Sequence, residues 1–273
     1  MTATHPEENV LNTAFSPCPN DTFMFHALLN GRIDTKGLDF VPHLYDIDAL
    51  NQMGFSKTFD ITKLSFYAAL KLRDSYTMLD AGNALGFGCG PLLVGLQPEE
   101  FTSESLVAIP GELTTANLLM RLWDPRIKRT VVDRFDSILQ GVANGSYDAG
   151  LIIHEGRFVY PDHGCKKIVD LGEWWEETTG LPIPLGCIAV NNSSPAFGHR
   201  EEIAMMLKDS IQYAFDHPRD ADAFVKAHAR EMDGDVISRH IDLYVNDFSL
   251  ALGETGKKAV STLQEMAWKA DIL

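Results

Sequence analysis

Short apolar runs alternate with helix-length amphipathic segments over the first two thirds of this chain. The runs that we expect to be strands cover residues 10–15, 38–44, 59–64, 92–94, 106–109, 131–132, 150–153 and 187–190. Parallel neighbouring strands need long crossover connections, and a helix usually supplies them. The alternation therefore predicts an α/β fold with mixed, mostly parallel sheets flanked by helices.

After residue 199 the pattern changes to consecutive helices. Apolar residues recur there at helical spacing, at Ile203, Met206, Leu207, Ile211 and Phe215. A helical block that follows two groups of α/β units predicts that the second lobe is inserted into the first. We expect residues 1–93 and 192–273 to form a discontinuous first lobe and residues 94–191 the inserted second lobe, with a ligand cleft between them.

The charge and composition exclude several classes of protein. The chain has 273 residues and a formal net charge of -15, so nucleic acid and anionic membranes are poor partners. With 45% apolar residues it can bury large cores, but its apolar runs are far shorter than the roughly 20 residues that cross a bilayer. The first eight residues carry no export signal, so we expect a cytoplasmic protein. The sequence leaves open whether it forms a homodimer.

The cysteines and glycines match none of the common metal or nucleotide motifs. The four cysteines form no close pair, which argues against a zinc knuckle and a redox site and favours a reducing compartment. Gly86, Gly88 and Gly90 are followed by Pro91 and an apolar run, so they do not form a dinucleotide fingerprint. We therefore expect no Rossmann-type cofactor and no zinc site built from these cysteines.

His154 stands at the carboxyl end of the expected buried strand 150–153. In open α/β sheets this end faces the ligand crevice, and a neutral imidazole there can act as a general base. The alternative is a histidine that only hydrogen-bonds the next loop. A zinc-protease motif would need a second histidine at position 158, where Phe158 stands.

Hydroxyl groups follow two other expected strands, each just before a helical stretch. Lys63 and Ser65 precede one helix, and Thr114 and Thr115 precede another. Helix starts bind anions, and an ammonium group adds a full charge, so both places could hold an anion. The alternative is that the hydroxyl groups simply cap the helices.

Ser16 and Asn20 occupy the first strand-to-helix turn, which Pro17 and Pro19 make rigid. Rigid turns suit binding loops, but a purely structural turn is equally consistent with this pattern. We expect Asn20 or one of the two residues after it, Asp21 and Thr22, to cap a helix over residues 23–30.

Four segments together resemble one enzyme family. They are Ser16-Pro17-Cys18-Pro19-Asn20-Asp21-Thr22-Phe23, Asp60-Ile61-Thr62-Lys63-Leu64-Ser65, Gly88-Cys89-Gly90-Pro91-Leu92 and His154-Glu155-Gly156. Their order and spacing resemble those of the 1,4-dihydroxy-6-naphthoate synthases, enzymes of menaquinone biosynthesis in the futalosine pathway. The resemblance extends from about residue 10 to the last helices. It implies a two-lobed type II periplasmic-binding-protein-like fold that works as an enzyme without a known cofactor or metal.

The resemblance also implies a reaction and a set of site residues. The reaction converts cyclic dehypoxanthine futalosine, a small anionic substrate, into 1,4-dihydroxy-6-naphthoate and dihydroxyacetone. His154 would be the proton acceptor, and the substrate-binding residues would be Lys63, Leu64, Ser65, Thr114 and Thr115. Ser16 and Asn20 are our own extension of this site. We expect Lys63 and the helix ends to form a positive patch that offsets the negative charge of the protein.

Two other functions remain open at this point. The chorismate dehydratases of the same pathway share the implied fold, and a solute-binding protein could capture a small anion in the same cleft without catalysis. Consumption of one substrate but not of the other would separate the two enzymes.

Overall fold

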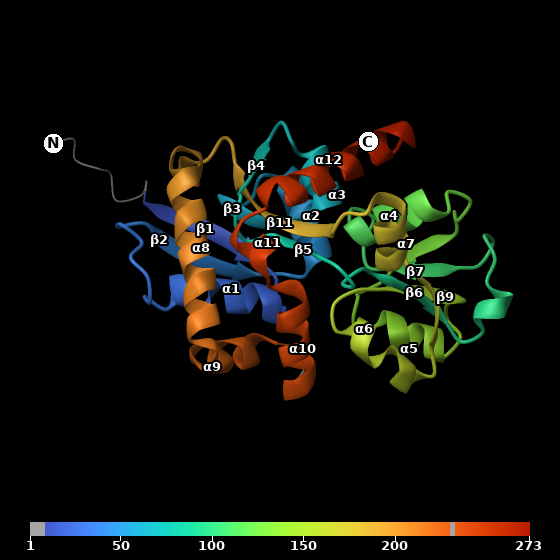
Figure 1. Cartoon of the computed structure of the whole chain (residues 1–273). Coiled ribbons are helices and arrows are strands. Elements are labelled where there is room, and N and C mark those ends of the chain that lie inside the picture. Colours follow the sequence, from blue (N-terminus) through green and yellow to red (C-terminus); the bar gives the residue numbers. More distant parts are fainter. Residues whose placement is uncertain (1–8, 230–232) are drawn as a thin grey trace. The chain divides into compact units, whose positions relative to one another are not determined.

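The computed structural model describes residues 9–229 and 233–273, and the chain divides into two compact units (Figure 1). The first unit comprises the chain up to Ala84 together with Gly186–Gly253, and the second comprises Leu85–Leu185 with Glu254–Leu273. The boundaries between the units lie after residues 84 and 185, whereas we expected them after residues 93 and 191. The division also groups the final residues, which we expected in the first lobe, with the second unit.

The first unit is built on a six-stranded mixed sheet with the order β2-β1-β3-β11-β4, in which β5 also pairs with β11. The strands are β1 (Val10–Phe15), β2 (Asp39–Leu44), β3 (Ile61–Ser65), β4 (Tyr76–Met78), β5 (Ala84–Gly86) and β11 (Ile183–Asn191). β1 pairs in parallel with β2 and β3, whereas β11 runs antiparallel to β3 and β4. The chain passes from one unit to the other inside β5, inside β11 and again after Gly253.

Helices cover the first sheet because its strands alternate their side chains between two apolar faces. The helices are α1 (Pro19–Leu29), α2 (Ile47–Phe55), α3 (Phe66–Lys71), α8 (Arg200–Asp216), α9 (Pro218–His228), α10 (Gly234–Tyr244) and α11 (Asp247–Leu250), with a short 3-10 helix, η3 (Pro195–His199). Leu11 and Phe15 of β1 pack in one core, whereas Ala14 packs with Leu50 of α2 in another.

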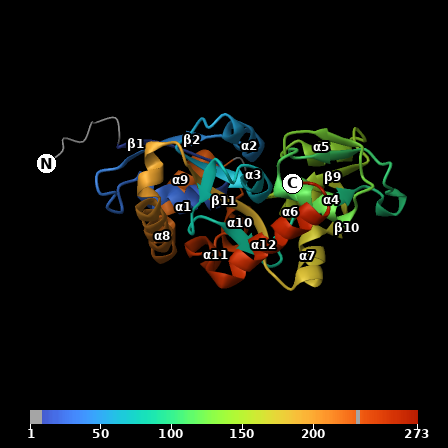
Figure 2. The ribbon, with the colours of Figure 1, turned by 90° about the horizontal axis from the view of Figure 1, so that it is seen from above.

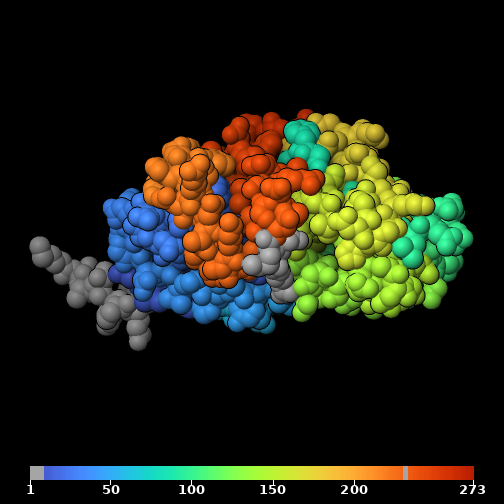
Figure 3. Space-filling model, turned by 90° about the horizontal axis from the view of Figure 1, so that it is seen from below, coloured from blue at the N-terminus to red at the C-terminus, as the bar shows by residue number. Residues whose placement is uncertain are grey.

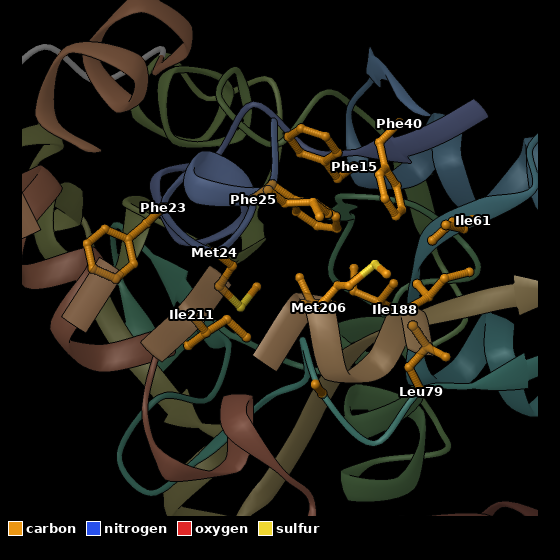
Figure 4. Close-up of a cluster of buried hydrophobic side chains, with 14 of the residues drawn as sticks. Phe15, Phe23, Met24, Phe25, Phe40, Ile61, Leu79, Ile188, Met206 and Ile211 are labelled. Atoms are coloured by element: carbon orange, nitrogen blue, oxygen red, sulfur yellow. The ribbon is translucent and has the colours of Figure 1, made fainter. Parts of the chain in front are cut away.

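The larger core lies between the first sheet and the helices α1 and α8. Phe15 of β1 stacks on Phe25 of α1 with ring centroids 4.3 Å apart, and Figure 4 shows both beside residues of other elements, such as Met206. Figures 1 and 2 show α1, α8 and α9 side by side. The orange helices α8, α9 and α10 make up much of the surface of this unit in Figure 3.

The second unit contains a five-stranded mixed sheet with the order β10-β6-β9-β7-β8. Its strands are β6 (Leu92–Gly95), β7 (Val107–Ile109), β8 (Thr130–Val132), β9 (Ala149–Ile152) and β10 (Lys166–Asp170). Its helices are α4 (Thr115–Trp123), α5 (Ile138–Ala143), α6 (Gly156–Val159), α7 (Leu171–Thr179) and α12 (Gly253–Lys269), with 3-10 helices η1 (Pro98–Glu100) and η2 (Tyr160–His163). Figure 1 shows α4 and α7 on one side of β6, β7 and β9, and α5 and α6 on the other.

All eight expected strands are confirmed, and no further strand follows residue 191 in the part of the chain that the structure describes. Three strands were missed. β4 and β5 are as short as the expected strands β7 and β8, but unlike these they contain no valine or isoleucine, and β10 begins with two exposed lysines. The expected start of α1 was wrong, because the helix begins at Pro19 and its N-cap is Cys18. Proline suits the first helical turn, where its missing N–H costs no hydrogen bond.

The search for membrane-spanning helices gave a negative result. Among residues 9–229 and 233–273, no helix combines the length and the apolar character that crossing a bilayer requires.

Candidate active site

The first polar cluster lies at the carboxyl edge of the first sheet. β1 and β3 are parallel, with Thr13 opposite Ile61, so both strands end at the same edge. Ser16 directly follows β1 and Ser65 is the last residue of β3, so the structure brings these two expected site residues to one edge. The first turn of α1, with Asn20, begins at this edge as well.

The buried carboxylate of Asp21 connects the members of this cluster. Its Oδ1 accepts hydrogen bonds from Lys63 Nζ at 2.7 Å and from Asn20 Nδ2 at 2.9 Å. Its Oδ2 accepts from the Ser16 hydroxyl at 2.7 Å and from the Ser16 backbone N–H at 3.2 Å. Asp21 is 1% exposed and Lys63 is 5% exposed. A buried pair at this distance compensates the lysine charge, so the expected positive patch from Lys63 is wrong.

Asn20 extends the cluster to the C-terminal helices. Because its Nδ2 donates to Asp21, its Oδ1 must be the atom that accepts from the ring of His240, whose Nε2 lies 3.0 Å away. This assigns a proton to Nε2 of His240, which is a buried residue of α10. The helical block after residue 199 thus supports the site through one buried histidine.

Ser65 and Leu64 have structural roles that the sequence did not reveal. The Ser65 hydroxyl accepts from Asn51 Nδ2 at 3.0 Å, and the Ser65 N–H donates to Asn51 Oδ1 at 2.9 Å, so this hydroxyl does not cap α3. Asn51 of α2 therefore holds the end of β3. The side chain of Leu64 is fully buried, and its backbone pairs with Cys187 of β11. Leu64 has a packing position and presents no polar side chain.

The second polar cluster lies at one edge of the second sheet. β7 and β9 are parallel, with Val107 opposite Ala149, so the turns after both strands emerge at the same edge. Thr114 and Thr115 follow β7, and His154 follows β9. The antiparallel strand β6 begins at this edge, which brings the turn around Gly90 there too.

His154 lies two residues beyond the end of β9 and has a positive φ of 54°. Its half-buried ring meets the ring of Phe135 edge-on, with centroids 5.2 Å apart. The carbonyl group of His154 accepts a hydrogen bond from the N–H of Arg157 at 3.3 Å. His154 thus follows a buried strand, as expected, although the strand ends two residues earlier, and the residue itself is only partly buried.

Thr114 and Thr115 use their hydroxyl groups differently. Thr114 caps α4: its Oγ1 accepts from the Asn117 N–H at 3.3 Å and donates to the carbonyl group of Gly111 at 2.8 Å. Thr115 donates to the carbonyl group of Leu185 at 2.7 Å. Each hydroxyl hydrogen is therefore committed to a carbonyl oxygen. Towards a ligand, the hydroxyl oxygens could accept hydrogen bonds, and N–H groups of the first turn of α4 could donate them.

The turn around Gly90 is anchored by an ion pair. Arg157 of α6 donates to the carbonyl group of Gly90 at 2.7 Å and to Asp170 Oδ2 at 2.6 Å. In the same turn, burial raises the pKa of the Cys89 thiol to about 12. Cys89 therefore stays protonated near neutral pH and is unsuited to be a nucleophile.

Several residues of these clusters were not predicted from the sequence. They are Asn51, Phe135, Asp170 and His240, together with the role of Asp21 as an acceptor. A lysine near the end of a buried strand was the one available signal, because a buried ammonium group needs a counter-ion. Within residues 9–229 and 233–273, no group of three or more histidine, cysteine or acidic side chains could hold a metal ion.

Comparison with known proteins identifies the family. A family model described as menaquinone biosynthesis matches residues 11–269. The chain belongs to this family. The 1,4-dihydroxy-6-naphthoate synthases of Thermus thermophilus and Streptomyces coelicolor are 44% and 41% identical to it, each over 93% of this chain and 92% of the relative. Both relatives are named as enzymes, so the interpretation as an enzyme of menaquinone biosynthesis is confirmed and simple solute binding is not favoured.

Solved structures show the fold of this family member. Protein AF1704 from Archaeoglobus fulgidus is 34% identical, with a TM-score of 0.90 over 97% of this chain and 99% of that one. The alkanesulfonate-binding protein SsuA from Xanthomonas axonopodis is only 13% identical, but its TM-score is 0.72 over 97% of this chain and 94% of that one. The expected periplasmic-binding-protein-like fold is therefore confirmed.

Proposed function

We propose that this enzyme is a carbon–carbon lyase that converts cyclic dehypoxanthine futalosine into 1,4-dihydroxy-6-naphthoate and dihydroxyacetone. The similarity to two named synthases over nearly the whole chain is the observation that carries this proposal. The position of His154, half-buried at the edge where β7 and β9 end, supports it. A base that is partly shielded from water but accessible to a ligand suits proton abstraction.

We assign the proton-accepting role to His154. Removal of a proton from the sugar-derived part of the substrate starts the fragmentation. The carbon–carbon bond breaks without any net oxidation or reduction, because its electrons remain in the two products. The gain of an aromatic naphthalene ring supplies the driving force. A positioned base and oriented hydrogen bonds suffice for this step.

Each polar cluster offers groups that suit a substrate rich in oxygen atoms. Thr114, Thr115 and the first turn of α4 provide acceptors and N–H donors for its hydroxyl and carboxylate groups. From the first unit, Ser16 presents acceptor lone pairs because its hydroxyl hydrogen is donated to Asp21. Lys63 contributes the N–H donors that Asp21 does not use. We therefore propose each of these residues as a substrate-binding residue, and substitution of any of them should weaken substrate binding.

Replacing His154 tests the catalytic assignment. His154→Ala should lower kcat by about 10²- to 10⁴-fold, the usual contribution of a general base, while ligand binding changes little. His163→Ala is the matched control, because His163 lies in the same unit but away from this edge. It is close to the start of β10, whereas the opposite end of β10 pairs with Leu92 at the edge near His154. Turnover near the native rate in folded His154→Ala protein would remove histidine catalysis from the proposal.

The substrate assignment has its own test. Purified protein should consume the cyclic futalosine derivative and release dihydroxyacetone, and it should leave chorismate unchanged. Consumption of chorismate instead would identify the protein as a dehydratase of the same pathway.

We also propose that the enzyme works in the cytoplasm. All four cysteines are buried reduced thiols, at Cys18, Cys89, Cys165 and Cys187. Such thiols persist in a reducing compartment. Fractionation of cells that express the protein should recover it with cytoplasmic markers, and recovery with exported proteins would refute this location.

A further inference from the structure

Arg157 connects the segment that contains His154 to other elements at the same edge of the second sheet. Its side chain is 17% exposed, and its guanidinium group forms hydrogen bonds to two different elements, the turn at Gly90 and the end of β10 at Asp170. An arginine held by two acceptors through separate nitrogens is fixed in direction as well as in position. The helix α6, which contains Arg157, therefore has a defined place on the edge.

The backbone of Arg157 reaches His154 directly. Its N–H donates to the carbonyl group of His154, and the neighbouring N–H of Gly156 donates to Ile153. His154 itself adopts a φ of 54°, a conformation that residues with a side chain rarely take. Such a conformation persists when its surroundings determine it more strongly than its own preference does. Within this turn, the anchored side chain of Arg157 supplies such a constraint.

The anchor points of Arg157 are themselves rigid. The other oxygen of Asp170 accepts the N–H groups of Gly172 and Glu173 at 2.8 and 3.2 Å and so caps α7. Gly90 packs directly against the backbone of Gly172, where a Cβ atom would find no room. The guanidinium group thus joins the His154 turn to a closely packed pair of backbones.

We infer that Arg157 is a positioning residue for catalysis, which holds the His154 imidazole in the direction needed for proton abstraction. This inference rests on the proposed role of His154 as the base. It assigns no substrate contact to Arg157. Its consequence is that loss of the guanidinium group should impair the chemical step through His154 and should affect substrate binding only weakly.

A double-mutant cycle between Arg157 and His154 tests the inference. Arg157→Gln should lower kcat by about 10- to 100-fold, because small misplacements of a catalytic group have effects of this size, and KM should change less than about threefold. In the His154→Ala background, measured in single turnovers at high enzyme concentration, the same substitution should change the rate by less than about twofold. Arg157→Lys, which keeps one hydrogen bond, should lie between the native enzyme and Arg157→Gln.

The control for Arg157→Gln is a variant of a second arginine–aspartate pair. Arg126→Gln removes another arginine–aspartate pair of this unit, to Asp124 at 2.8 Å, and should leave kcat unchanged. An equal loss with and without His154, or a native kcat in folded Arg157→Gln, would overturn the inference. If Arg157→Gln melts below the assay temperature, Arg157→Lys takes its place in the cycle, with the same outcomes. A native rate in His154→Ala would instead refute the proposed base.

Discussion

At the scale of single residues, Asp21 determines what Lys63 and Ser16 present at the edge of the first sheet. Its two oxygens accept four hydrogen bonds, which neutralise the lysine and orient the serine hydroxyl. Burial of this carboxylate is tolerated because every bond to it comes from a buried donor. Removal of either charge should therefore affect the other.

The Asp21–Lys63 pair yields a prediction about stability. Asp21→Asn leaves a buried ammonium group without its counter-ion and should lower the free energy of unfolding by about 3–5 kcal/mol. Adding Lys63→Met should recover much of this loss, because no uncompensated charge then stays buried. Urea unfolding of the native protein, both single variants and the double variant measures the effect. A double variant that is less stable than Asp21→Asn would contradict this explanation.

At the scale of elements, the approach of the Gly90 turn to the start of α7 determines the shape of the edge near His154. A Cβ atom on Gly90 would overlap the backbone of Gly172, and backbone cannot move aside as a flexible side chain can. The carbonyl group of Gly90 also accepts from Arg157. Position 90 therefore needs glycine for reasons of space, and the support of the His154 turn depends on it.

Gly90→Ala should reduce both stability and activity. Overpacking of this kind costs about 1–3 kcal/mol, and the displaced carbonyl group should weaken the Arg157 anchor and lower kcat. Gly88→Ala is the matched control in the same turn: its φ of 67° makes alanine strained, but no atom lies within 4 Å of the added Cβ. Thermal melts and steady-state kinetics should show a lower kcat for Gly90→Ala only. A native kcat in Gly90→Ala would show that catalysis does not depend on this packing.

At the scale of the whole molecule, the net charge of -15 would act on the anionic substrate that we propose. Because the structure pairs Lys63 with Asp21, this lysine does not offset the negative field as we first expected. Repulsion between protein and substrate should therefore slow their encounter at low ionic strength. At a salt concentration of 0.1 M, such repulsion is largely screened beyond about 10 Å.

Added salt should therefore increase the activity at low substrate concentration. Raising sodium chloride from about 10 mM to about 150 mM shortens the screening length and should increase kcat/KM, with kcat nearly constant. Initial rates at low substrate concentration, measured across this range, give the dependence. A fall in kcat/KM with added salt would show that a local positive field attracts the substrate.

The sequence by itself determined the fold class and the places where site residues follow strands. Strand and helix periods are properties of each segment alone, so the runs at 92–94 and 150–153 could be predicted without knowing their partners. His154 could be placed at a strand end for the same reason. The prediction failed at β4 and β5, which lack the valine and isoleucine residues that marked the equally short strands β7 and β8.

Only the tertiary structure decided which groups pair with one another. Lys63 is 42 residues from Asp21 in sequence, and His240 is 220 residues from Asn20, yet each pair forms a hydrogen bond. The sequence showed neither that Lys63 is buried nor which acidic residue compensates its charge. Pairing depends on the distance between side chains in the folded chain, which local periodicity does not encode. For the same reason, the anchoring of the His154 turn by Arg157, Gly90 and Asp170 became visible only in the folded protein.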